Sequence, residues 1–234
     1  MENQFTRTET LIGKDALTKL ANSHIAVFGI GGVGGHVVEA LARAGVGNID
    51  LIDNDDINIT NINRQIIALN STIGKSKVEV AKERILDINP KAKVNCIKKF
   101  FSPETSGDFD FSPYDYVIDA IDSVTGKIEL ILKSQESNTP IISCMGTGNK
   151  LHPEMFEITD IYKTSVCPLA KIMRTELKKR GVKSLNVLYS KETPIKPLGI
   201  IDDNKSIPAS IAFVPSVAGL IIASEVVKDI ISEE

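Results

Sequence analysis

Short apolar runs alternate with segments of helical periodicity over the first two thirds of the chain. The runs are typical of buried strands and read IAVFGI, NIDLID, KVNCI, YDYVIDAID and PIISCM. Between them lie VVEALARAG, KSKVEVAKERILDI and VTGKIELILKSQ, in which apolar residues recur at helical spacing. Alternating strands and helices of this kind predict an α/β fold with a mostly parallel sheet and helices on both faces.

Two segments fall outside this alternation. The first is a short helical lead, LIGKDALTKLANS, and the second begins near residue 150. The latter combines strand-like MFEITDIY and SLNVLYS, a helix PLAKIMRTELKKRG and a Pro-rich loop at 194–208. We interpret the chain as one domain, 1–234, with a core at about 20–148 and a C-terminal, substrate-facing elaboration at about 150–234. The polar loop is expected to be mobile.

Bulk composition limits the function classes. A chain of 234 residues with 42% hydrophobic residues can bury one sizeable core. The N-terminus has no basic and apolar leader pattern, so a cytoplasmic location is expected. The apolar run at 211–224 contains Pro215 and is shorter than a membrane span, which favours core packing. Because the net charge is −3, any binding of nucleic acid must rely on a local basic patch.

The three cysteines, Cys96, Cys144 and Cys167, have neither CxxC pairing nor metal-ligand spacing. This fits a reducing compartment and argues against structural zinc. Cys144 or Cys167 is a possible nucleophile, but neither has a neighbouring His in the sequence, so a thioester step has little support.

The stretch from residue 26 to residue 56 carries the first chemical signal. A G-x-G-G-x-G pattern directly follows an apolar run and directly precedes a helical segment, at Gly29, Gly31, Gly32 and Gly34. Such glycines let a phosphate approach the N–H groups of a helix N-terminus. Asp53 ends the next apolar run, where a carboxylate can accept from ribose hydroxyls. A Rossmann-like nucleotide site is predicted; the plainer alternative is close packing of helix on strand.

Two basic residues distinguish ATP from NAD. Arg64 lies in TNINRQ and Lys77 in TIGKSKVEVAKERILDINP. A hydride-transferring enzyme keeps the pyrophosphate of NAD intact, whereas cleavage of ATP between the α and β phosphates needs cations for the leaving pyrophosphate. Farther on, VIDAIDS places Asp119 and Asp122 at the end of another predicted strand. Asp122 is a candidate magnesium ligand beside the triphosphate, and Asp119 is interpreted as structural.

Four separated motifs, GIGGVG, LIDNDDINITNINRQ, IGKSKVE and DAIDS, resemble in order and spacing those of the adenylating enzymes related to ubiquitin-activating enzymes. The resemblance covers about residues 5–148 and implies ATP and Mg²⁺ as cofactors. It implies catalytic roles for Arg7, Arg64, Lys77 and Asp122, with magnesium on Asp122. The nucleotide-binding residues that it implies, beside the four glycines, are Asp53, Asp55, Asn61, Asn63, Arg64, Gln65, Lys77 and Asp122. It also implies a homodimer in which Arg7 reaches the neighbouring subunit's ATP site.

The second half resembles one branch of this superfamily, through residues 160–181 and 210–230. Members of this branch dehydrate threonylcarbamoyladenosine in tRNA to a cyclic oxazolone by activating its carboxylate with ATP. A basic cluster supports a tRNA partner and comprises Lys163, Lys171, Arg174, Lys178, Lys179, Arg180 and Lys183. A sulfurtransferase-type partner protein is a further implication, although the chain has no cysteine beyond Cys167.

Three alternatives stay open on the sequence. An activator of a sulfur-carrier or ubiquitin-like protein fits the first half, although the paired cysteines for zinc are missing. An NAD-binding oxidoreductase fits the glycine turn, but it leaves Arg64 and Lys77 without a role. A tRNA-binding scaffold without catalysis fits the basic cluster.

Overall fold

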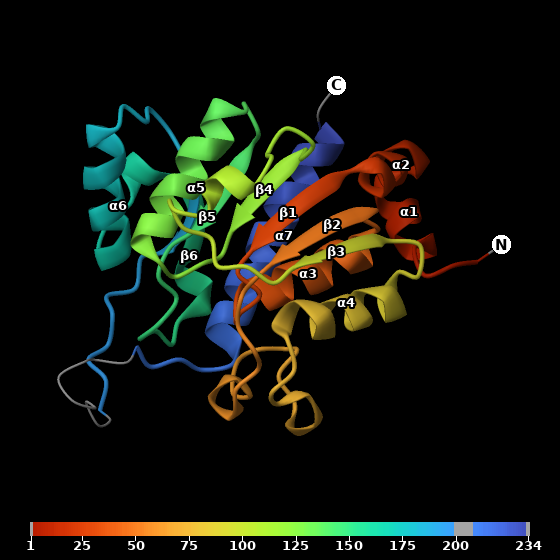
Figure 1. Ribbon diagram of the computed structural model, residues 1–234, viewed down its shortest axis with the longest axis horizontal. Helices are drawn as coiled ribbons and strands as arrows, with labels where there is room; N and C mark the ends of the chain where they lie inside the picture. Colours follow the sequence, from red (N-terminus) through yellow and green to blue (C-terminus); the bar gives the residue numbers. More distant parts are fainter. Residues whose placement is uncertain (1, 199–207, 233–234) are drawn as a thin grey trace.

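The computed structural model describes residues 2–198 and 208–232 and contains a twisted sheet at its centre (Figure 1). Over these residues the sheet has seven strands in the order β3-β2-β1-β4-β5-β7-β6, all parallel except β6, which is antiparallel to β7. The strands are β1 (His24–Phe28), β2 (Asn48–Ile52), β3 (Lys93–Ile97), β4 (Tyr116–Asp119), β5 (Ile141–Cys144), β6 (Phe156–Asp160) and β7 (Asn186–Ser190). The predicted mostly parallel α/β sheet is confirmed.

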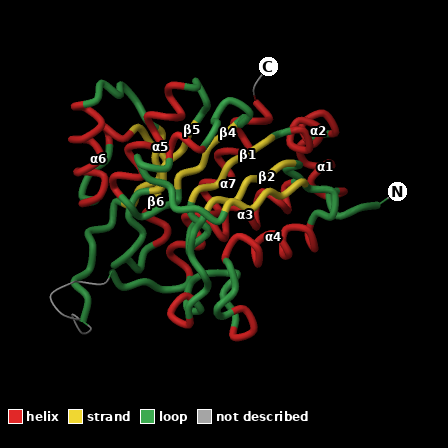
Figure 2. The backbone as a smooth tube through the Cα atoms, in the orientation of Figure 1, coloured by secondary structure: helices red, strands yellow, loops and turns green. Residues whose placement is uncertain are grey.

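Helices cover both faces of the sheet (Figure 2). They are α1 (Thr6–Ile12), α2 (Lys14–Asn22), α3 (Gly34–Ala44), α4 (Lys77–Ile88), α5 (Val124–Glu136), α6 (Pro168–Lys179) and α7 (Phe213–Ser232). The helical lead is divided into α1 and α2, because Gly13 between them has φ +86°, outside the helical region.

The core lies in two layers, one on each face. Alternate strand residues such as Val27 and Leu51 pack with α3, α4 and α7. Their neighbours, such as Phe28, face the other way and pack with α5 and with aromatic side chains of the 101–114 segment. Both faces of the central strands are therefore buried, which explains why these strands read as continuous apolar runs.

The second half of the chain continues the same sheet through β7 and β6. The apolar run at 211–224 forms much of α7, and a Cβ atom at Gly219 would lie 2.5 Å from the carbonyl oxygen of Val33, the residue directly before α3. This close approach packs α7 onto the segment that follows β1. Among the described helices, none combines the length and the apolar character needed to cross a membrane. The loop predicted to be mobile lies mainly at 199–207, outside the described residues.

Candidate nucleotide and substrate site

A cavity of about 680 Å³ lies where the parallel strands end. Its walls come from the segments that follow β1, β2, β3, β4 and β5, and from the segments at 208–210 and Pro215. In the sheet, β2 and β3 lie on one side of β1, and β4 and β5 lie on its other side, so the strand order reverses between β1 and β4. Open α/β sheets bind ligands at the carboxyl ends of the strands beside such a switch point. Of the predicted nucleotide-binding residues, all but Gly34 and Asn63 line this cavity.

The glycine turn brings strand β1, helix α3 and the end of β4 into close contact. Gly29 has φ +90°, and a Cβ atom there would lie 2.7 Å from the Ala120 carbonyl oxygen. Gly34 lies at the start of α3, where a Cβ atom would lie only 1.8 Å from the Gly29 carbonyl oxygen. Gly34 therefore permits the packing of α3 against the turn, while Gly31 and Gly32 line the cavity, and nucleotide binding by Gly34 stays a prediction.

The turn exposes a row of hydrogen-bond donors. Among the described residues, the backbone N–H groups of Gly31, Gly32, Val33 and Gly34 make no hydrogen bond within the protein. Helix α3 has no side-chain cap, and its first turn carries no acidic residue. Free donors of this kind, together with the helix dipole, favour an anionic group such as the predicted phosphate.

Replacing Gly34 by Ala is expected to destabilise the protein by about 3 kcal/mol, because the new methyl group meets backbone that cannot move aside without separating α3 from β1. Gly107→Ala is the matched control, since a Cβ atom at Gly107 would have no neighbour within 4 Å. Urea unfolding of both variants measures the difference. Equal stabilities would contradict the packing role of Gly34.

Asp53 stands at the cavity wall directly after β2. Its carboxylate accepts from the N–H of Ile30 at 2.7 Å and from the N–H of Asp55 at 2.9 Å. Burial raises the pKa of Asp53 above its usual range, although the nearby Lys77 ammonium and the two N–H donors act in the opposite direction. The carboxylate therefore fixes the glycine turn relative to β2, in addition to its predicted contact with a ribose.

Lys77 begins helix α4 and points to the same acidic segment. Its ammonium lies 2.7 Å from Asp55 Oδ2 and 3.8 Å from Asp53 Oδ2, and its side chain is 7% exposed. A buried cation at the edge of the cavity interacts with a phosphate more strongly than a solvated one, because the local dielectric constant is lower. Lys77 is thus positioned to neutralise charge on a phosphate in the cavity.

The segment TNINRQ begins within a short 3₁₀ helix, Ile59–Asn61, that is capped by Asn58. Arg64 donates to the Thr60 carbonyl and to Asn63 Oδ1, both at 2.9 Å, and lines the cavity. Asn63 does not line it: its amide donates to the Ser210 carbonyl at 3.0 Å. Asn63 thereby connects Arg64 to the 208–210 segment, and its contact with a nucleotide stays a prediction.

Gln65 supplies an additional polar group. The residue is 6% exposed and lines the cavity, and its Oε1 has no hydrogen-bond partner among the described residues. A buried acceptor without a partner is costly unless a ligand or water donates to it. A nucleotide offers ribose hydroxyl donors of the required kind.

The two carboxylates of VIDAIDS have different surroundings. Asp122 is exposed and lines the cavity. Asp119 is fully buried, and its carboxylate accepts from Lys127 Nζ at 3.0 Å and from the N–H of Ile121 at 3.3 Å. The structural interpretation of Asp119 agrees with these contacts.

Arg7 lies apart from the cavity of its own chain. It is an exposed residue of α1, and Phe5 beside it packs near Gly45, the residue that ends α3 close to the start of β2. This position is at the amino end of the strands, opposite the cavity (Figure 1). A role for Arg7 in nucleotide binding therefore requires a second subunit.

Several cavity residues were not predicted. Lys99, Phe100 and Phe101 follow β3, Gly146, Thr147 and Gly148 follow β5, and Leu169, Pro208, Ala209, Ser210 and Pro215 come from the second half. Most of these carry no charge or glycine pattern that points to a nucleotide. Their position after parallel strands was the only available signal for the first two groups.

The 208–210 segment is held over the cavity by side-chain amides. Ala209 exchanges backbone and side-chain hydrogen bonds with Asn149, both at 2.7 Å, and Ser210 accepts from Asn63. Asn149 has φ +60°, a conformation that Asn adopts more readily than most residues. Residues 149 and 63 thereby connect the second half of the chain to the nucleotide site.

The cysteines do not provide a reactive thiol at this site. Cys144 lines the cavity, but burial raises the pKa of its thiol to about 12. Cys167 is 2% exposed, and burial raises the pKa of Cys96 to about 11. The surroundings of Cys144 and Cys96 favour the neutral thiol over the nucleophilic thiolate.

The predicted basic cluster is only partly available to a ligand. Lys163, Lys171, Lys178 and Lys183 are exposed and form no ion pair with an acid among the described residues. Arg174 instead donates to the Thr164 carbonyl at 3.0 Å, and Lys179 and Arg180 both lie 2.7 Å from Glu176. These three residues use hydrogen bonds in fixing α6 or in ion pairs, and their role in tRNA binding stays a prediction.

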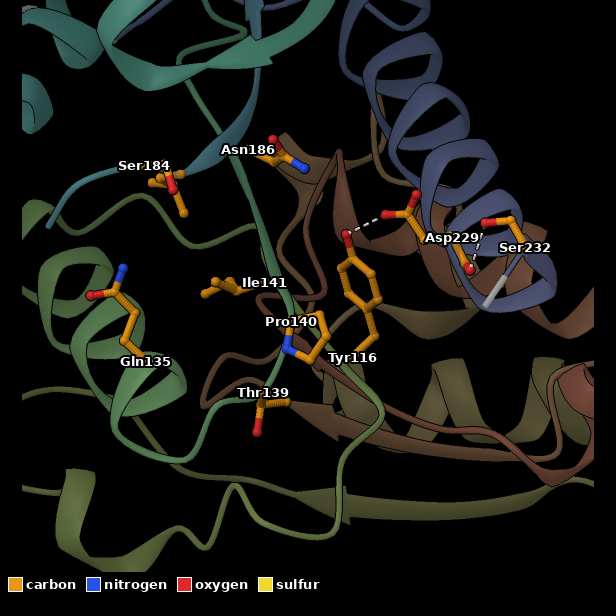
Figure 3. A pocket seen from close by; sticks show the side chains of 10 residues that line it. Tyr116, Gln135, Thr139, Pro140, Ile141, Ser184, Asn186, Asp229 and Ser232 are labelled. Atoms are coloured by element: carbon orange, nitrogen blue, oxygen red, sulfur yellow. Dashed lines mark hydrogen bonds between the residues drawn. The ribbon is translucent and has the colours of Figure 1, made fainter. Parts of the chain in front are cut away.

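A second, more open cavity of about 410 Å³ lies at the other end of the strands, beside Tyr116, Ile141 and Asn186 (Figure 3). The Tyr116 hydroxyl donates to Asp229 at 2.8 Å there. Tyr116 and Ile141 are the first residues of β4 and β5. This cavity has no glycine turn and no basic lining residue, so it does not suit a nucleotide phosphate.

Comparison with known proteins agrees with this geometry. The ThiF family model matches residues 5–234. The tRNA threonylcarbamoyladenosine dehydratase of Bacillus subtilis is 47% identical over 245 residues, covering 100% of this chain and 96% of the relative. The protein of the same name from Escherichia coli is 40% identical over 202 residues, covering 83% and 75%. The crystal structure of the E. coli enzyme, TcdA, in complex with ATP has a TM-score of 0.90 and 36% identity, covering 98% and 94%.

Proposed function

Because this chain belongs to the ThiF family, we propose that it uses ATP to dehydrate threonylcarbamoyladenosine in tRNA. The reaction closes the threonylcarbamoyl group into an oxazolone ring. The observation that carries the proposal is the cavity in which free N–H donors of the glycine turn, Lys77, Arg64 and Asp122 meet at one edge of the sheet. The B. subtilis relative with the dehydratase name covers 100% of the chain.

The chemistry proceeds in two steps. A carboxylate oxygen of the threonyl group attacks the α-phosphorus of ATP, and pyrophosphate leaves. The ureido oxygen of the same group then attacks the activated carboxyl carbon, AMP leaves with the original carboxylate oxygen, and a nitrogen proton is lost. Because nucleophile and electrophile lie on one small group, the effective molarity is on the order of 10⁵ M or more, so no enzymatic nucleophile is needed.

The protein residues mainly bind and neutralise the triphosphate. The N–H donors of the glycine turn hold phosphate oxygens, and Lys77 and Arg64 stabilise the charge that moves onto pyrophosphate. Asp53 and Gln65 accept from the ribose hydroxyls. Asn61 lines the same wall as Arg64 and completes the ribose contacts.

Asp122 is the residue that fits magnesium. It is an exposed carboxylate in the cavity, and the described residues contain no group of three or more His, Cys, Asp or Glu side chains that could hold a metal without other ligands. Magnesium commonly takes one or two carboxylates together with substrate phosphates and water. When bound, it supplies positive charge to the phosphate oxygens during transfer.

Two further components belong to the proposal. A homodimer brings Arg7 of one subunit toward the cavity of the other, which fits its exposure and its distance from the cavity of its own chain. A sulfurtransferase-type protein is the second component, and it would act by docking and not by sulfur transfer to Cys167, whose side chain is buried. Action on tRNA places the enzyme in the cytoplasm.

The exposed lysines of α6 form the proposed tRNA contact. Replacing Lys171 and Lys178 together by Ala is expected to weaken tRNA binding and to reduce the slope of log K against log salt by about 1.5, since each lost phosphate contact removes about 0.7 to 0.9. The control is the double change Lys91→Ala and Lys93→Ala, which removes the same charge near β3 at the other edge of the sheet. Titrations at several salt concentrations measure the slope. Equal slopes in both double variants would contradict the assigned face.

The decisive experiment is mass spectrometry of nucleosides from threonylcarbamoylated tRNA incubated with the protein, ATP and magnesium. The proposal requires that the modified adenosine loses one water and that AMP is released in equal amount. If the nucleoside stays unchanged and a Gly-Gly carrier peptide is adenylated instead, the protein is an activator of sulfur carriers. Binding of tRNA without AMP release under any condition would identify a scaffold.

A further inference from the structure

A buried ion pair lies beneath the cavity without lining it. Lys127 Nζ is 3.0 Å from Asp119 Oδ1, and the two side chains are 1% and 0% exposed. Taking both charges out of water is costly, and an apolar pair of similar volume commonly gives equal or greater stability. The pair therefore calls for an explanation beyond stability.

Its hydrogen bonds connect three separate elements. Asp119 ends β4, and its second carboxylate oxygen accepts from Ser143 Oγ of β5 at 2.5 Å. Lys127 lies in the first turn of α5 and also donates to the Cys144 carbonyl, at the end of β5, at 2.7 Å. A single buried cluster thus fixes the ends of two neighbouring strands against the start of one helix.

The two segments that leave this cluster both line the cavity. Ala120–Ser123 follows Asp119 and carries Asp122, and Met145–Gly148 follows Cys144. Asp119 also accepts from the N–H of Ile121, one residue before Asp122. The bonds of the cluster therefore act directly on the backbone at the start of both segments.

We propose that Asp119 and Lys127 are positioning residues for the adenylation step. They set the distance between the segment with Asp122 and the segment after β5, so that the ATP phosphates and the attacking carboxylate meet in line. An apolar pair would fill the space but would leave the Cys144 carbonyl and the Ser143 hydroxyl without these partners. This inference rests on the proposed function.

The test uses the double variant Asp119→Asn and Lys127→Met, which removes both charges without leaving one of them buried alone. Asn retains an acceptor for Ser143, and Met occupies the space of the lysine stem. The variant is expected to bind ATP, measured by calorimetry, within about threefold of the unchanged protein. Its rate constant for AMP formation is expected to fall about 100-fold, the size that a displacement of about 1 Å produces in a catalytic site. Amide hydrogen exchange at 121–123 and 145–148 is expected to become faster.

The matched control removes a different ion pair, with Glu39→Gln and Arg84→Met. These residues connect α3 to α4 at 2.5 Å and do not line the cavity. The control is expected to lower the melting temperature while AMP formation stays within about threefold and exchange at 121–123 and 145–148 stays unchanged.

Three results would overturn the inference: AMP formation in the Asp119/Lys127 variant within threefold of the unchanged protein, an equal loss in the control, or unchanged exchange at both segments. Failure of the proposed function is distinguishable, because the unchanged protein would then release no AMP with the modified tRNA. In that case the exchange measurement alone decides: faster exchange confined to the two segments supports the positioning role, and unchanged exchange removes it.

Discussion

Lys77→Met is expected to lower the rate of AMP formation by about 10³-fold. Removing one preorganised hydrogen-bond donor that stabilises developing charge lowers a rate by about 10²-fold to 10³-fold, and removing a positively charged group lowers it by somewhat more. Among the basic residues of the cavity, Lys77 is expected to have the largest effect because its ammonium is almost fully buried at the cavity edge. Its removal also leaves Asp53 and Asp55 without their cation, so repulsion of the triphosphate adds to the loss.

The measurement is AMP release with threonylcarbamoylated tRNA under single-turnover conditions. Lys75→Met serves as the control, because Lys75 is exposed two residues earlier and does not line the cavity. Circular dichroism and tRNA binding are expected to stay unchanged in both variants. A Lys77→Met protein that forms AMP at a rate within tenfold of the unchanged protein would remove Lys77 from the phosphate site.

Asp122→Asn is expected to reduce AMP formation by a similar factor, about 10³, with a different dependence on magnesium. The amide keeps the shape of the side chain but loses the negative charge that favours magnesium as a ligand. More magnesium is therefore needed for half-maximal activity, and adding it is expected to restore part of the rate.

A magnesium titration of AMP formation checks this result. The control is Asp56→Asn, since Asp56 pairs with Lys98 at 2.6 Å and does not line the cavity. An Asp122→Asn protein with the magnesium requirement of the unchanged enzyme would show that this carboxylate does not hold the metal.

The local sequence was sufficient for most of the fold. Residues such as Val27 and Leu51 belong to continuous apolar runs, and such runs predict buried parallel strands because both faces of each strand need apolar neighbours. The C-terminal apolar run was assigned to the core on its length and Pro215, and it forms part of α7. The division of the helical lead at Gly13 was missed, because a glycine within a helical pattern is compatible with either outcome.

For the candidate site too, some features follow from the local sequence and others only from the tertiary structure. The sequence by itself predicted that the glycine turn, Asp53, Arg64, Lys77 and Asp122 belong to one site, since charge and backbone freedom at strand ends are local properties, and these residues line one cavity. Only the tertiary structure decided that Gly34 serves packing, that Asn63 holds Ser210, and that Lys127 pairs with Asp119 beneath the cavity. Asn63 and Ser210 are 147 positions apart, whereas the contacts of Gly34 with Gly29 and of Lys127 with Asp119 form only because the chain turns back from a strand end into a helix. Neither kind of contact leaves a periodic mark in the sequence.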